Sequence, residues 1–120
     1  MNTIKDIYEK CGSKEEFIAT VQNELEKLSK ENPDFIYSND DNMCYYNKGP
    51  EDNPEKCSGC IFGQALQNMG VSRESLNFIG PIDEVLTQQL PINLDEIPRD
   101  WARIQYEQDI GCKWGDLFND

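Results

Sequence analysis

Residues 13–32 carry the pattern that most restricts how this chain can fold. Apolar side chains recur there at helical spacing and form one stripe: Phe17, Ile18, Val21, Leu25 and Leu28. A stripe of this width has to be buried against another part of the protein. Ser13 and Glu16 form a capping-box pattern at the start, and Asn32 stands before Pro33, which pushes it out of the helical region. The segment is therefore predicted to be an amphipathic helix that starts after Ser13 and ends before Pro33.

Shorter helical patterns cover most of the remaining chain. Apolar spacing predicts helices at about residues 3–10, 60–69 and 99–110, and a glycine suited to a helix stop follows each one: Gly12, Gly70 and Gly111. A short capped helix is expected at about 72–76. A further helix is expected to begin near Pro81 and to end before Pro91.

Several side chains in these helices predict how they pack. Gly63 lies inside a predicted helix, where glycine is about 1 kcal/mol less favourable than alanine, so we expect another backbone to approach it closely. Three side chains of the last helix are expected to pack: Trp101, Ile104 and Tyr106. The tail after Gly111 keeps Trp114 and Leu117, and we expect it to dock on the core.

Residues 35–46 differ from the rest of the chain. Two short aromatic and β-branched runs, 35–37 and 43–46, are separated by the turn formers Ser-Asn-Asp-Asp-Asn. This pattern predicts a small β-hairpin, and residues 47–55 after it read as an exposed loop. The expected fold class is therefore mainly α, that is, α+β with one small β-hairpin, in a single compact helical domain over residues 1–120.

The composition is strongly acidic but suits a folded domain. The chain has 120 residues, a formal net charge of −12, no histidine and a hydrophobic fraction of 38%. A chain of this size and composition can bury its own core without metal or disulfide links. No apolar run approaches the roughly 20 residues of a membrane span, and the first residues do not resemble a signal peptide. We therefore expect a cytoplasmic protein that contacts no membrane.

The motifs of common enzyme classes are missing from the sequence. Without histidine the chain lacks the usual general base near neutral pH and the commonest metal ligand. It also lacks a glycine-rich phosphate loop, a Gly-x-Ser-x-Gly elbow and a calcium-loop spacing. We expect a protein that works without catalysis and without a cofactor.

The cysteines leave one alternative open. Cys57 and Cys60 have the spacing of half a zinc site, and Cys44 and Cys112, or Cys11, would have to complete it. The same pair precedes a helix, where a lowered thiol pKa supports disulfide exchange. A Cys-ligated zinc-binding domain or a thiol-redox domain is therefore the alternative to a binding protein. The simplest interpretation is that the other cysteines are small buried side chains.

The acidic residues are concentrated in two parts of the chain. Residues 31–60 hold seven acids and two bases, and residues 74–120 hold ten acids and three bases, whereas residues 1–30 nearly balance. Such a surface repels nucleic acid and anionic membranes and attracts a basic protein surface, for example that of a nucleic-acid-binding protein. We expect such a partner, bound through mimicry of phosphate charge. The alternative is that the acidity serves solubility alone.

The predicted partner-binding surface lies on the hairpin turn and the loop that follows it. Few bases offset the acids there, and binding residues concentrate on loops held by a rigid scaffold. The expected binding residues are Asp34, Asp40, Asp41, Glu51, Asp52 and Glu55. The competing surface would be formed by acids of the C-terminal third, such as Asp95, Glu96 and Asp100.

Two stretches resemble a family of small proteins of tailed bacteriophages and prophages. Residues 60–66 and the following Gly-Val are similar to its Cys-x-x-Gly-x-Ala-Leu helix, and residues 105–115 are similar to its Gln-x-x-Gln-Asp-x-Gly-x-x-Trp-Gly ending. The stretch 50–56 looks like an insertion and Cys57 like an addition. The resemblance implies a phage or prophage origin and a small helical domain, and it carries structural signatures rather than a catalytic set. The expectation of a counter-defence inhibitor rests instead on the net charge of −12 and the absence of histidine.

Three polar side chains of the second motif need a separate interpretation. Gln105, Gln108 and Asp109 share one face of the predicted last helix. Buried side chains that cap a neighbouring helix or bond to a loop are the favoured interpretation, and a binding site on that face is the alternative.

Overall fold

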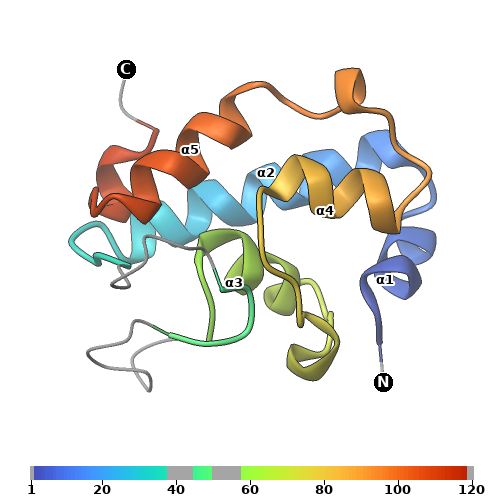
Figure 1. Ribbon diagram of the computed structural model, residues 1–120, viewed down its shortest axis with the longest axis horizontal. Coiled ribbons are helices and arrows are strands. Elements are labelled where there is room, and N and C mark those ends of the chain that lie inside the picture. Colours follow the sequence, from blue (N-terminus) through green and yellow to red (C-terminus); the bar gives the residue numbers. More distant parts are fainter. Residues whose placement is uncertain (1, 38–44, 50–57, 119–120) are drawn as a thin grey trace.

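The computed structural model describes residues 2–37, 45–49 and 58–118. Its helices follow one another as α1 (Ile4–Cys11), α2 (Lys14–Glu31), α3 (Ile61–Asn68), η1 (Arg73–Ser75), α4 (Ile82–Gln89), η2 (Leu94–Glu96), α5 (Asp100–Asp109) and η3 (Trp114–Asp116), where η marks a 3-10 helix. In Figure 1, α4 and α5 lie in front of α2, and α3 lies below them. The predicted mainly α fold class is confirmed.

The long helix α2 forms as its sequence predicts. The Ser13 hydroxyl accepts a hydrogen bond from the Glu16 amide at 3.2 Å, and the Asn32 amide closes the other end on the Leu28 carbonyl at 2.9 Å. The apolar stripe is buried, with Phe17 and Leu25 fully inaccessible. Because α3, α1 and η3 all pack against it, α2 is the support on which the other elements assemble.

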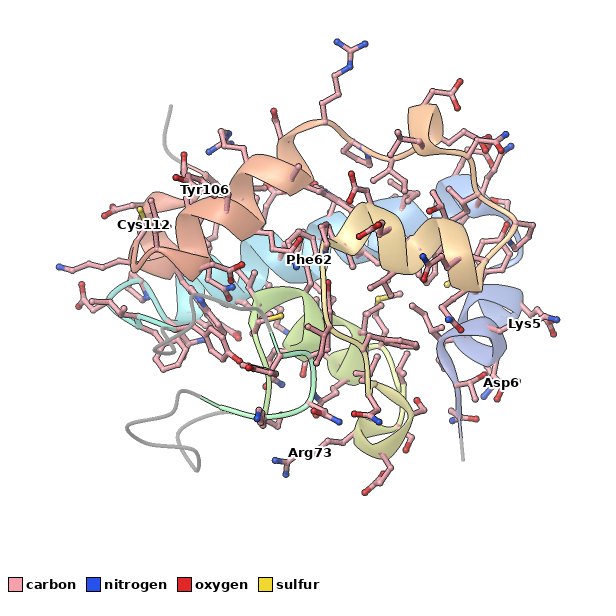
Figure 2. All side chains as sticks on the ribbon, viewed as in Figure 1. Lys5, Asp6, Phe62, Arg73, Tyr106 and Cys112 are labelled. Atoms are coloured by element: carbon pink, nitrogen blue, oxygen red, sulfur yellow. The ribbon has the colours of Figure 1, made fainter. Side chains whose placement is uncertain are left out.

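The core lies where α2, α3 and α5 meet. Phe62 of α3 lies near the centre of the molecule in Figure 2, and the centroid of its ring lies 5.6 Å from the ring centroid of Trp101 of α5. The indole N–H of Trp101 reaches across to the Gln22 carboxamide oxygen at 2.7 Å. None of the helices that the structure describes has the length and apolarity needed to cross a lipid bilayer.

Gly63 allows the backbone of Tyr46 to lie directly on α3. A Cβ atom at Gly63 would overlap the Tyr46 carbonyl group, and a Cβ at Gly59 would meet the same group. Gln67, one turn further along α3, donates from Nε2 to the Tyr46 carbonyl oxygen at 3.1 Å. The prediction of a close backbone approach at Gly63 is confirmed.

The predicted β-hairpin at 35–46 is not found in the part of that segment that the structure describes; residues 38–44 lie outside it. Its two described ends instead pair with other segments, Ile36 with Lys113 and Tyr45 with Ile79, through isolated antiparallel bridges. The Trp114 amide also donates to the Phe35 carbonyl at 2.9 Å, and the two rings lie 4.6 Å apart. Long-range partners therefore win over the local pairing that the turn residues suggest.

The C-terminal tail is docked, as predicted. Trp114 and Leu117 are buried, and the Gly115 amide donates to the Pro33 carbonyl at 2.9 Å. A Cβ on Gly115 would lie 2.7 Å from that oxygen, so the close contact requires glycine. The tail thus covers the C-terminal end of α2.

We predict that Gly63→Ala destabilises the protein although alanine is the better helix former. Helix propensity alone would give a gain of about 1 kcal/mol. The overlap with the Tyr46 carbonyl has to be relieved by moving backbone, and overpacking of this kind costs about 1–3 kcal/mol. Urea unfolding of the variant, beside the exposed control Asn68→Ala in the same helix, measures the difference. A Gly63→Ala protein as stable as the original chain would contradict the contact.

Candidate functional site

Most of the predicted partner-binding residues lie outside the described part of the chain. This holds for Asp40, Asp41, Glu51, Asp52 and Glu55. Asp34 is described: its side chain is 91% exposed, and a carboxylate oxygen lies 3.9 Å from the Lys113 ammonium. An exposed pair at this distance contributes little to stability. The loop surface stays a prediction.

The cysteines of the zinc and redox alternative are partly described. Cys44 and Cys57 lie outside the described residues, Cys60 is buried and disulfide-bonded, and Cys11 and Cys112 are half-buried free thiols. Burial, and then the Glu16 carboxylate, raise the pKa of Cys11, which disfavours its thiolate. Among residues 2–37, 45–49 and 58–118 no three metal-ligating side chains gather at one point. The zinc and redox hypotheses remain predictions.

Gln108 caps helix α3 from the side. Helix α3 begins after Cys60, which provides no side-chain cap, so the first amide of the helix has to find an acceptor elsewhere. The Gln108 Oε1 atom accepts from the Ile61 amide at 2.6 Å, and its Nε2 atom donates to Asp109 at 2.9 Å. Gln108 is fully buried, and this bond ties α5 to the start of α3.

Gln105 does the same for α4. The residue before α4 is Pro81, which has no side-chain donor or acceptor, and Gln105 Oε1 accepts from the Ile82 amide at 2.7 Å. Gln105 Nε2 donates to the Tyr46 hydroxyl oxygen at 2.8 Å, and that hydroxyl donates to the Gly80 carbonyl at 2.6 Å. The predicted burial and capping role is thereby confirmed for Gln105 and Gln108, whereas Asp109 is half-buried and accepts from Gln108.

A neighbouring side of α5 faces a surface groove, and Gln105 lies at its edge. One hollow of about 390 Å³ lies between the start of α4 and the outer side of α5, and a second of about 620 Å³ continues it toward η2. Both are lined by Asp83 and Ala102, so they form one groove. We call it the α4–α5 groove; its other main lining residues are Pro81, Leu94, Asp95, Ile97, Pro98, Arg99, Tyr106 and Asp109.

The α4–α5 groove combines exposed apolar side chains with carboxylates. Tyr106 is 64% and Leu94 63% exposed, although both are large and apolar. Figure 2 marks Tyr106 on α5. The sequence-based prediction that Tyr106 packs in the core is therefore wrong. Positions 101, 104, 105 and 108 share the inner face of the helix, and Tyr106 belongs with Ala102 and Asp109 on the outer face.

This groove was missed by sequence reasoning, although part of its signal was present. The spacing of 102, 106 and 109 places these residues on one helix face, which the pattern of inner residues already implies. The sequence does not show that α4 and η2 lie against that face. Acids of the C-terminal third, which the sequence offered as the competing surface, supply Asp83 and Asp95 to the groove.

The buried hydroxyl of Tyr46 predicts a loss of stability in alkali. Burial raises the pKa of Tyr46 above its ordinary value of 10.0 because the phenolate is poorly solvated there. The folded protein holds this proton more tightly than the unfolded chain. The contribution of the protonated Tyr46 hydroxyl to the free energy of unfolding is therefore complete below pH 10. It is lost as the pH rises from there toward the raised pKa, by about 1.4 kcal/mol per pH unit.

Urea unfolding of the original chain and of Tyr46→Phe tests this. We expect the original chain to be the more stable near neutral pH, by about 1–3 kcal/mol, since the variant leaves the Gln105 amide poorly paired. The difference should shrink as the pH rises from about 10 to about 11. A difference that stays constant over this range would show that the Tyr46 hydroxyl titrates normally in the folded protein.

Comparisons of the chain with protein-family models, with curated protein sequences and with solved structures find no match. Its function has to be inferred from its own residues and from the groove and capping geometry above.

Proposed function

We propose that this chain is an acidic protein that binds a basic protein partner without catalysis and inhibits it by imitating the charge of a nucleic acid. The proposal places it in the cytoplasm. The resemblance to phage and prophage proteins suggests that the partner is a nucleic-acid-binding defence protein of the bacterial host. Repulsion from the net charge of −12 works against direct binding of nucleic acid or anionic membranes.

The observation that carries this proposal is the supply of carboxylates without cationic neighbours. Residues 74–118 contain nine acids and three bases. Two of those bases are already engaged, Arg103 with Glu107 at 3.1 Å and Lys113 near Asp34. Several of these acids form no ion pair with any cation that the structure describes, among them Asp83, Glu84, Asp95 and Asp100. Their potential is therefore not cancelled locally and is available to a cationic partner.

The residues of the two motifs that resemble the phage family have structural roles in this protein. Gly63 admits the Tyr46 backbone, Gln105 and Gln108 cap two helices, and Gly115 admits Pro33. Each of these residues has a defined packing or hydrogen-bonding role. The acidic surface is a feature of the described residues for which stability gives no reason, since exposed charges contribute little to folding.

Affinity capture with a polyanion competition tests the proposal. The immobilised chain is exposed to a bacterial lysate at about 50 mM salt, where surface charges are weakly screened. We expect retained basic proteins to be released by about 300 mM salt and by a DNA duplex. Polyglutamate of the same total charge should release them less well, because it lacks the spacing of phosphates. If both polyanions release the proteins equally well, the chain binds basic proteins by charge but does not mimic a nucleic acid. If no basic protein is retained at low salt, the proposal is refuted.

Charge-reversal variants then locate the surface. Replacing Asp40, Asp41, Glu51 and Asp52 with lysine should slow association at least about tenfold at low salt and flatten its salt dependence. Replacing Glu9, Glu15, Glu24 and Glu26 changes the net charge equally and serves as the matched control. If the control set weakens binding as much as the loop set, no local surface exists. If neither set matters and reversal of Asp95 and Asp100 abolishes binding, the loop placement is wrong while the function stands.

A further inference from the structure

We propose that the α4–α5 groove is a docking site for a short amphipathic helix of the partner, with apolar side chains in its centre and Lys or Arg on its flanks. This inference rests on the proposed function and adds a second contact surface to the loop acids. The surface consists of one face of α5, the first turn of α4 and the connector that contains η2.

The size and shape of the groove suit a helix. Ala102, Tyr106 and Asp109 follow one another along the outer face of α5, and from Ala102 to Asp109 the helix rises about 10 Å, which is two turns. The two joined hollows run alongside this face. Ala102 is exposed and small, so it leaves room between the larger Tyr106 and Leu94. An amphipathic helix places its own apolar side chains into a groove of this kind, and those side chains recur at intervals of three and four residues.

The exposed apolar side chains of the groove predict apolar contacts with the bound helix. Tyr106 and Leu94 each leave almost two thirds of their surface in water, and among the exposed large apolar side chains of the described residues these two line the groove. Exposed apolar side chains gathered beside a hollow are typical of an interaction site. Tyrosine in particular is enriched among the residues that dominate binding energy. The Tyr106 ring therefore is the main anchor of the proposed site.

The charge of the groove selects the occupant. Asp83 stands where the two hollows join, and Asp95 lines one end, whereas Arg99 is the cation on the lining. A second copy of this chain would bring another net charge of −12 to this surface, and repulsion disfavours it. A cationic helix is attracted by Asp83 and Asp95 while its apolar face covers Tyr106. The segment that binds in the groove therefore has to combine a positive charge with an apolar face.

Peptide titration followed by NMR tests the site directly. The probe is a helix-forming peptide of about 11 residues, three turns, with leucine on one face and lysine on the others. A second peptide keeps every lysine and replaces leucine with glycine and serine. We expect the leucine peptide to shift the amide signals of Ala102 and Tyr106, and the second peptide to bind at least about tenfold more weakly.

A matched pair of variants supplies the control. Ala102→Arg fills the groove and adds one positive charge, and Ala19→Arg adds the same charge at an exposed alanine of α2. We expect Ala102→Arg to weaken the leucine peptide at least about tenfold and Ala19→Arg by less than about threefold. Circular dichroism of both variants checks that the fold is kept.

The remaining outcomes separate the groove from the proposed function. Binding of the leucine peptide that moves other amides, or that Ala102→Arg and Ala19→Arg weaken equally, overturns the groove and leaves a basic partner in place. Equal binding of both peptides overturns the apolar anchor. Groove signals that shift with protein concentration in the absence of peptide assign the groove to a second copy of the chain. No binding of either peptide at low salt overturns the groove, and the proposed function is refuted as well only if the lysate experiment also retains no basic protein.

Discussion

Two buried carboxamides of α5 hold three helices in one arrangement. Gln108 accepts from the first amide of α3, and Gln105 accepts from the first amide of α4. Neither helix has a cap from its own N-terminal residue, and an unpaired amide in that position would cost about 1–3 kcal/mol once buried. Because each bond joins residues more than 20 positions apart, it fixes tertiary structure as well as a helix end.

These bonds also place Tyr46 and divide the surface of α5. Gln105 holds the Tyr46 hydroxyl, and the Tyr46 backbone lies against Gly63 of α3, so one turn residue connects α3, α4 and α5. Since the inner face of α5 is committed to caps and core contacts, Ala102 and Tyr106 lie on the neighbouring exposed side of the helix. The α4–α5 groove is therefore a consequence of the same face assignment that stabilises the fold. One of its carboxylates, Asp83, comes from α4, whose start Gln105 caps.

The helices were predictable because their signals are local. The stripe from Phe17 to Leu28, the Ser13 cap and the glycine stops all depend on neighbouring residues, and the helices begin and end close to the predicted positions. The hairpin depended on pairing between 35–37 and 43–46, but Ile36 and Tyr45 pair with residues far along the chain. A turn sequence permits a hairpin without excluding better partners elsewhere. For the same reason the capping face was recognised, while its targets Ile61 and Ile82 were not, and the groove was missed.

Amide hydrogen exchange at Ile61 and Ile82 tests the central claim most directly. The first amides of a helix ordinarily lack an acceptor and exchange quickly. Lys14 occupies the corresponding position in α2 and serves as the internal reference. If the glutamines hold the helices together, Ile61 and Ile82 exchange as slowly as amides in the helix interiors, and Gln108→Leu releases Ile61 while Ile82 stays protected. Exchange of Ile61 and Ile82 as fast as that of Lys14 in the original chain would contradict the account.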